Sequence, residues 1–210
     1  MKFVDLKNTM SDKYSVKKRE GNGETVILLY PNNPDGSPNL DGGYHLVGNH
    51  AEKEWKLYET QRDKKFLKAV FPREEPGLLG LYLAVKKVYE HKQSDFDREM
   101  KNKLRNINQP GEGIDLLEQQ FDQNLFSFNK ETKGAINIIQ EGTEFSVCYI
   151  STLGESVPIT KNRPLQSAFS AAYNYCQLLT VFSDLFEEWK ERLQLSLAEE
   201  EKLKRIFMGK

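Results

Sequence analysis

The sequence lacks several features that would assign it to a large class of proteins. It has only two cysteines, Cys148 and Cys176, in 210 residues. Both stand in apolar surroundings, which predicts small buried side chains and not the disulfide framework of a secreted domain. No run of about 18 uncharged apolar residues is present, so no membrane partner is expected. The first residues lack the apolar core of a secretory signal, and we therefore expect a cytoplasmic protein.

An excess of charge of either sign is also missing. Lysine and arginine number 30 against 31 aspartates and glutamates, giving a formal net charge of -1. A protein that coats DNA depends on unbalanced cationic charge, so this balance argues against that class. Aromatic residues make up 11% of the chain, which is too many for a disordered segment. The chain is therefore expected to fold, and it is long enough to bury a core.

Short catalytic and metal-binding motifs are absent as well. The sequence contains no Gly-x-Ser-x-Gly, phosphate-binding loop, His-Glu-x-x-His or Cys-x-x-Cys, which excludes the enzymes recognisable from them. The histidines, His45, His50 and His91, lack the spacing of a zinc site. The sequence thus predicts no cofactor, no metal ion and no enzymatic activity, although an active site of scattered carboxylates would leave no local pattern.

One loop has part of a calcium-binding pattern. Alternate positions of the turn-rich segment 31–43 carry Asp35, Ser37, Asn39 and Asp41. A calcium loop needs glycine at its sixth position and glutamate at its twelfth, where this chain has Leu40 and Leu46. Turn formation explains the same residues, and it is the interpretation that we favour.

An internal repeat organises the chain. Residues 44–89 align without a gap with residues 134–179, with hydrophobic character matched and few identities. In each copy, apolar and polar residues first alternate with the period of two that is typical of strands with one face on a core. Apolar residues then recur with the period of an amphipathic helix. A chance alignment of two β-rich stretches is the alternative. We predict an α+β fold of two related halves, each an antiparallel β-meander followed by a helix, with a helical C-terminus.

The two halves are expected to differ at their ends. The first covers residues 1–93, with a hairpin at 13–30, strands within 44–71 and a helix at 77–92. Gly21-Asn22-Gly23 supplies the hairpin turn. Residues 94–111 are expected to form a helical linker that ends in prolines and glycines, and residues 112–210 the second half with its long C-terminal helices. Ser196 and Glu199 predict a capping box at the start of the last helix.

A strand pair carries the candidate binding surface. Strand alternation would place Lys56, Tyr58, Phe66 and Lys68 on the face opposite the core. Cations interleaved with aromatic rings suit a protein interface, or stack on bases and contact phosphates. The matching positions of the second copy are serine, cysteine and proline, which disfavours nucleic acid relative to a protein partner or a plain solvated face. The candidate partner-binding residues are Trp55, Lys56, Tyr58, Arg62, Lys64, Lys65, Phe66 and Lys68.

The order of elements around this surface resembles a known family. A strand and charged turn from Glu54 to Lys64 precede a strand ending at Phe71, the pair Glu74-Glu75 and an apolar helix. This order is similar to that of the small α+β immunity proteins of bacterial polymorphic toxin systems. The second copy lacks the arginine and the acidic helix start. The resemblance implies a cytosolic inhibitor that covers the active site of its target enzyme and has no chemistry of its own.

The expected function is therefore inhibition by stoichiometric binding. The partner would be a toxin, a nuclease or a defence enzyme, and a counter-defence protein of a phage or mobile element is a related version. A nucleic-acid-binding module that uses residues 55–68 is the alternative. An enzyme with an unrecognised carboxylate site is the third interpretation.

Overall fold

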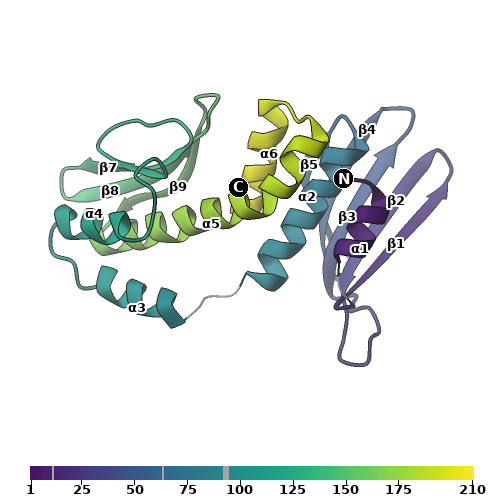
Figure 1. The fold of residues 1–210 in the computed structure, drawn as a ribbon, viewed down its shortest axis with the longest axis horizontal. Coiled ribbons are helices and arrows are strands. Elements are labelled where there is room, and N and C mark those ends of the chain that lie inside the picture. Colours follow the sequence, from purple (N-terminus) through teal and green to yellow (C-terminus); the bar gives the residue numbers. More distant parts are fainter. Residues whose placement is uncertain (11, 63, 92–94) are drawn as a thin grey trace. The chain divides into compact units, whose positions relative to one another are not determined.

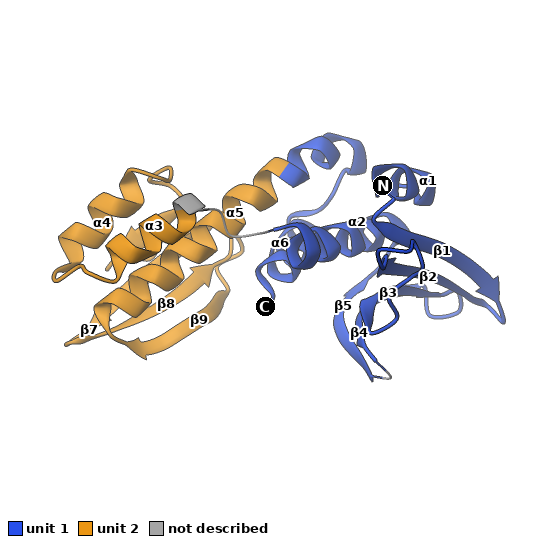
Figure 2. Cartoon of the chain, turned by 90° about the horizontal axis from the view of Figure 1, so that it is seen from below, with its two compact units in different colours: residues 1–91, 185–209 blue, residues 92–184, 210 orange. Residues whose placement is uncertain are grey.

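The computed structural model of the chain has the predicted α+β fold, organised in two compact units (Figures 1 and 2). It describes residues 1–10, 12–62, 64–91 and 95–210. The first unit comprises Met1–His91 and Leu185–Gly209, and the second comprises Lys92–Asp184 with Lys210.

The first unit is a five-stranded meander with helices on one side. Its antiparallel strands lie in chain order: β1 (Tyr14–Gly21), β2 (Glu24–Pro31), β3 (Gly42–Asn49), β4 (Glu54–Gln61) and β5 (Lys64–Phe71). Its helices are α1 (Phe3–Thr9), α2 (Glu74–Val85), the π-helix η1 (Lys86–Glu90) and α6 (Leu197–Met208). The end of α5, from Leu185, also belongs to this unit.

Local sequence explains the first hairpin. Asn22 and Gly23, between β1 and β2, have φ angles of 52° and 76°. Two such residues form the turn whose twist matches that of antiparallel strands, and asparagine and glycine tolerate it best. The paired strands Tyr14–Gly21 and Glu24–Pro31 agree with the predicted hairpin.

The core of the first unit lies between α2 and one face of the sheet. Leu46, Leu57 and Phe71 from β3, β4 and β5 are fully buried on that face. Two glycines let α2 come close to them. A Cβ added at Gly77 would lie 3.0 Å from the Leu46 side chain, and one added at Gly80 would lie 2.8 Å from the Phe71 ring.

Helix α2 differs from its prediction. It was expected at 77–92 as an amphipathic helix with a polar face, but every residue from Pro76 to Val85 is buried. The sheet covers one side of α2, and α1 and α6 pack on it elsewhere. No local sequence pattern indicates that α2 is buried on every face, because α6, which covers part of it, is more than a hundred residues away in the chain.

An ion pair holds the start of α6 to the segment before α2. The Arg73 guanidinium donates to both carboxylate oxygens of Glu199, at 2.9 and 3.1 Å. The same carboxylate accepts a hydrogen bond from the Ser196 backbone N–H, while the Ser196 hydroxyl accepts one from the Glu199 N–H, so the predicted capping box is confirmed. Burial raises the pKa of Glu199, but the hydrogen bonds from Ser196 and Arg73 outweigh it and the net shift is downward.

The second unit is a four-stranded sheet with helices. Its strands, in sheet order, are β6 (Phe126–Phe128), β7 (Ala135–Glu141), β8 (Glu144–Ile150) and β9 (Ser156–Arg163). The pair β6–β7 is parallel and the other pairs are antiparallel. Its helices are α3 (Asp95–Leu104), α4 (Pro110–Glu118) and α5 (Leu165–Leu193) up to Asp184. Helix α5 runs along one face of this sheet (Figures 1 and 2).

The two halves share an order of three strands and a helix. β3, β4, β5 and α2 correspond to β7, β8, β9 and α5 in the alignment of 44–89 with 134–179. The buried pair Leu46 and Leu57 corresponds to Ile136 and Val147, which are also buried. A register shift separates Leu57 from Tyr58, and another separates Val147 from Cys148 at the matching place. The extra residue is Lys68 in the first copy and Ile159 in the second, one place from the aligned position, and β8 has a further shift between Phe145 and Val147.

The unit boundaries differ from those expected. Residues 94–111, expected as a linker, contain α3, which belongs to the second unit. Asp97 of α3 is 2% exposed, and its carboxylate accepts hydrogen bonds from Tyr173 and Gln177 of α5 at 2.8 and 2.6 Å. Residues 185–209, expected in the second half, belong to the first unit, where Trp189 packs against Tyr82 of α2.

Among the residues that the structure describes, no helix combines the length and the apolar character needed to span a bilayer.

We expect Tyr173→Phe to destabilise the second unit. The variant leaves the buried Asp97 carboxylate with one donor fewer, and a hydrogen bond to a charged group contributes about 2 kcal/mol. Hydrogen exchange of the α3 amides measures the loss where it arises. Tyr175→Phe, on the same helix, is the matched control. Equal exchange rates of the α3 amides in the two variants would contradict a stabilising hydrogen bond between Tyr173 and Asp97.

Candidate functional site

The eight predicted binding residues all lie on β4, β5 and the turn between them, but they do not share one face. Lys56 pairs with Val70 and Tyr58 with Leu67, whereas Phe66 pairs with Glu59. Cross-strand partners project to the same side of a sheet, so Phe66 lies on the side opposite Tyr58. The expectation that Lys56, Tyr58, Phe66 and Lys68 form one surface is therefore wrong.

A β-bulge is the reason. The register shifts between Leu57 and Tyr58, and one extra residue in β5 reverses the side to which the preceding side chains point. Lys68 reaches Glu59 in an ion pair of 3.3 Å. Strand alternation counted from the sequence misses such a residue, because a bulge has no composition of its own.

The other predicted residues also have separate places. The Trp55 ring lies against Gly48 on the core side, where an added Cβ would be 2.8 Å from it. Arg62 adopts a φ of 52° at the β4–β5 turn. A shallow hollow of about 700 Å³ at this turn is lined by Asp41, Gln61, Arg62, Lys64 and Phe66. Lys56, Tyr58 and Lys65 remain on the side of the sheet away from the core.

That side of the first sheet, which we call the open face, is built from three rows of cross-strand neighbours. One row is Lys17, Leu28, His45, Tyr58 and Leu67, and a second is Arg19, Val26, Val47, Lys56 and Val70. A third is Ser15, Tyr30, Gly43, Thr60 and Lys65. Helices α1, α2 and α6 lie on the other side of the sheet, so none of the helices described in the first unit covers this face (Figure 2).

The open face has an apolar and aromatic centre with cations at its borders. Lys17 and Arg19 are exposed on β1, and Lys65 is exposed on β5. Lys56 is neutralised by Glu52 and Glu54, at 2.9 and 3.4 Å. The three rows contain no carboxylate, and within the described ranges Lys17, Arg19 and Lys65 have no ion-pair partner. The face is therefore cationic although the chain is nearly neutral.

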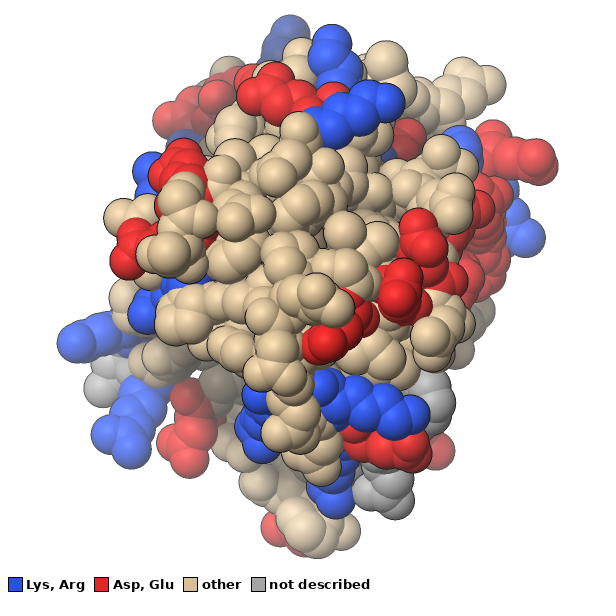
Figure 3. Space-filling view, turned by 90° about the vertical axis from the view of Figure 1, so that its left-hand side faces the viewer, with Lys and Arg blue, Asp and Glu red and all other residues tan. Residues whose placement is uncertain are grey.

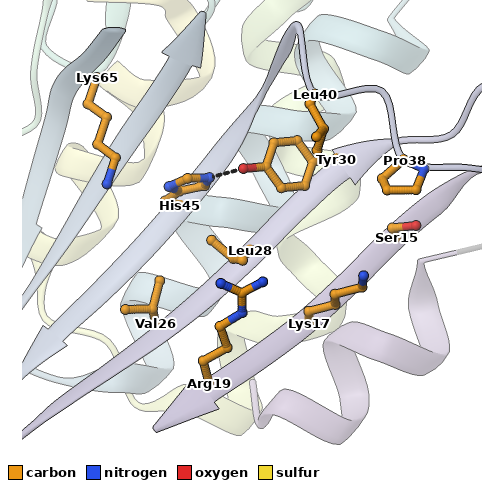
Figure 4. Close-up of a pocket in the computed structure, with 10 residues that line it drawn as sticks. All are labelled: Ser15, Lys17, Arg19, Val26, Leu28, Tyr30, Pro38, Leu40, His45 and Lys65. Atoms are coloured by element: carbon orange, nitrogen blue, oxygen red, sulfur yellow. Dashed lines mark hydrogen bonds between the residues drawn. The ribbon is translucent and has the colours of Figure 1, made fainter. Parts of the chain in front are cut away.

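A pocket of about 480 Å³ opens on this face (Figure 4). β1, β2 and β3 form its floor, Lys65 approaches from β5, and the loop after β2 adds Pro38 and Leu40. Its lining residues are Ser15, Lys17, Arg19, Val26, Leu28, Tyr30, Pro38, Leu40, His45 and Lys65. Most of these are missing from the predicted site. The alternation of Ser15, Lys17 and Arg19 along β1 was the signal in the sequence that could have indicated them.

A tyrosine–histidine pair lies in the pocket. A hydrogen bond of 2.5 Å joins the Tyr30 hydroxyl and His45 Nε2, and the rings meet edge to face. His45 is 8% exposed. Burial lowers its pKa to about 4, and the nearby charges of Lys65 and Arg19 act in the same direction. The imidazole is therefore neutral at pH 7.

Gly43 sets the position of the Tyr30 ring. A Cβ added at residue 43 would lie 2.5 Å from Tyr30 Cδ1 and 2.6 Å from the Leu29 carbonyl oxygen. Since the carbonyl belongs to the sheet backbone and cannot move away, any larger residue would displace the strand or the ring. The pocket thus requires glycine at this position.

Turn formation accounts for the loop with the calcium-like pattern. Asp35 Oδ1 accepts hydrogen bonds from the Ser37 backbone N–H and hydroxyl, at 2.9 and 2.6 Å. Asn39 Oδ1 accepts one from the Asp41 N–H at 3.0 Å. These are local turns of the kind that aspartate and asparagine form with their own backbone.

The second unit offers different surface chemistry. The positions matching Lys56 and Tyr58 are Ser146 and Cys148. The centre of the view in Figure 3 is largely uncharged, with acidic and basic side chains around its edges. Both cysteines are free, and burial raises the pKa of the Cys176 thiol, which makes that thiol unreactive.

We expect His45 to make the stability of the first unit depend on pH. An unfolded histidine has a pKa near 6.5, and the folded value is about 4. Between these values only the unfolded chain binds the proton, so the free energy of unfolding falls by about 2 kcal/mol from pH 7.5 to pH 5. Urea unfolding at both pH values measures the free energy of unfolding. The decrease between pH 7.5 and pH 5 should be lost in His45→Gln and kept in His91→Gln. An unchanged pH dependence in His45→Gln would contradict it.

Comparisons with known proteins add no assignment to this geometry. No protein-family model matches the chain, and neither curated proteins nor solved structures give a match. The resemblance to immunity proteins therefore stays a prediction.

Proposed function

We propose that this chain is a non-enzymatic inhibitor that binds an acidic surface of a partner enzyme through the open face of its first unit. One observation carries the proposal. The open face is an uncovered sheet surface in which Lys17, Arg19 and Lys65 border an apolar centre without any carboxylate. Interfaces of this kind combine a dry centre with charges that fix orientation and speed association.

Exposed apolar side chains on and beside the face support the same proposal. Leu67 is 55% exposed on β5, and Leu40 is 63% exposed on the loop beside the pocket. Exposed leucines that adjoin an aromatic strip give a partner apolar area to bury. Half-buried Tyr30 and Tyr58 add the residue type that most often dominates binding energy.

The partner is expected to be acidic where it binds. A toxin, nuclease or defence enzyme that holds Mg²⁺ with carboxylates has such a cluster in its active site. Lysine and arginine side chains placed there would replace the cation and block substrate. Inhibition needs no chemistry from the inhibitor, and a cytoplasmic location belongs to this proposal.

The test is charge reversal on one side of the sheet. Proteins crosslinked to the chain in its native host are identified, and the pair is reconstituted from purified components. We expect a 1:1 complex that Lys17→Glu with Arg19→Glu weakens at least about 100-fold, because two attractive contacts become repulsive. Lys64→Glu, at the separate β4–β5 hollow, should change the Kd less than about threefold. A reconstituted partner that binds the double variant as tightly as the native chain would refute the proposal.

Single-stranded nucleic acid is the second candidate. Tyr30 and Tyr58 lie on the same face as the three cations, and such rings can stack on bases while cations contact phosphates. Three phosphate contacts predict a loss of roughly 20-fold in affinity between 50 and 200 mM salt. Fluorescence anisotropy with a labelled 12-nucleotide DNA or RNA strand measures this. No binding at 50 mM salt would eliminate the candidate.

A further inference from the structure

The pocket on the open face brings cations to a neutral polar pair. Lys65 approaches the Tyr30–His45 pair from β5, and Arg19 approaches it from β1 (Figure 4). Both cations act on His45, and Arg19 also acts on Tyr30, where it opposes the rise in pKa that burial causes. Lys17 adds a third cation from β1. The positive potential is therefore concentrated at this pair.

Two polar atoms beside the pair lack a hydrogen bond. His45 Nδ1 and Thr60 Oγ1 are buried and have no partner within the part of the chain that is described. His45 is 8% exposed and Thr60 is 4% exposed. The two residues are neighbours across β3 and β4, because Thr60 pairs with Gly43 and Tyr58 pairs with His45. Buried polar groups almost always have a partner. Of these two residues, His45 lines the pocket, so its unused hydrogen-bonding capacity points to a group bound there.

The side chains of the pocket offer mainly hydrogen-bond donors to a ligand. The lysine and arginine side chains of the pocket only donate hydrogen bonds. When the Tyr30 hydroxyl donates to Nε2, the neutral His45 ring carries its proton on Nδ1 and donates as well. None of the ten lining residues is acidic. The complement of this set is an anion with several acceptor oxygens.

The rest of the pocket is apolar. Val26 and Leu28 form its floor, and Pro38 and Leu40 form the side near the loop. Its volume of about 480 Å³ lies within the range of small-molecule sites, roughly 300–1,000 Å³. The space exceeds what a bare anion needs, so an apolar body beside the anionic group fits it better.

We propose that this pocket binds a small phosphate monoester, with its phosphoryl group between Arg19 and Lys65 and its apolar body against Pro38 and Leu40. Three cations match a phosphoryl dianion better than a single carboxylate charge. One of its oxygens supplies the acceptor that His45 Nδ1 lacks. The site goes beyond the proposed function and does not require it, since a small ligand is tested on the isolated chain.

Phenyl phosphate is the probe, and titration is followed by ¹H–¹⁵N NMR at pH 7. We expect saturable 1:1 binding with shifts at the His45 ring and the Lys65 amide. Arg19→Gln and Lys65→Gln should each weaken it at least about tenfold, because each removes a charge-assisted hydrogen bond. Lys64→Gln, whose side chain lies at the β4–β5 hollow, is the matched control and should bind as the native chain does. Amide spectra of the free variants show whether each is folded.

Two further probes distinguish the ligand class. Inorganic phosphate should bind more weakly than phenyl phosphate because it cannot use the apolar side, and benzoate more weakly because it carries one charge. The proposal would be overturned if inorganic phosphate or benzoate bound as tightly as phenyl phosphate. It would also be overturned if titration with phenyl phosphate did not saturate. If the monoester binds but Lys17→Glu with Arg19→Glu leaves the partner complex intact, the proposed function fails and this inference stands.

Discussion

The packing of α2 against one face of the first sheet is the constraint on which the unit depends. Gly77 and Gly80 let the helix backbone lie close to Leu46 and Phe71, where an added Cβ would be 3.0 and 2.8 Å from their side chains. The helix is buried on all sides, because α1 and α6 cover what the sheet does not. Helices α1, α2 and α6 thus gather on one side, and none of the described helices of the unit covers the opposite side of the sheet.

The open face follows from that asymmetry and from one bulge. Once the core side is set by Leu46 and Leu57, alternation determines which residues of β1 to β4 project the other way. The bulge at Leu57/Tyr58 then exchanges the roles of β5 residues, so that Leu67 and Lys65 project with Tyr58 while Phe66 does not. A single inserted residue decides which cations meet which aromatic rings.

The open face and its pocket share the same cationic side chains. Lys17, Arg19 and Lys65 line the pocket and border the face, and no carboxylate in the three rows offsets them. Burial lowers the pKa of His45, and the charges of Lys65 and Arg19 add to that shift, which leaves a neutral hydrogen-bonding ring at the centre of a cationic site. A partner surface and a small anion would use these groups in turn and would therefore exclude each other.

The sequence by itself determined the α+β class, the first hairpin and the cap of α6. These depend on short-range features: alternation, a turn that tolerates positive φ, and a Ser–Glu pair at helix spacing. It also indicated three residues of the open face, Lys56, Tyr58 and Lys65. Only the tertiary structure decided the rest, because the return of α6 to α2 and the bulge in β5 depend on long-range packing and backbone pairing. The pocket around Tyr30 and His45 exists only once three strands and a loop have come together.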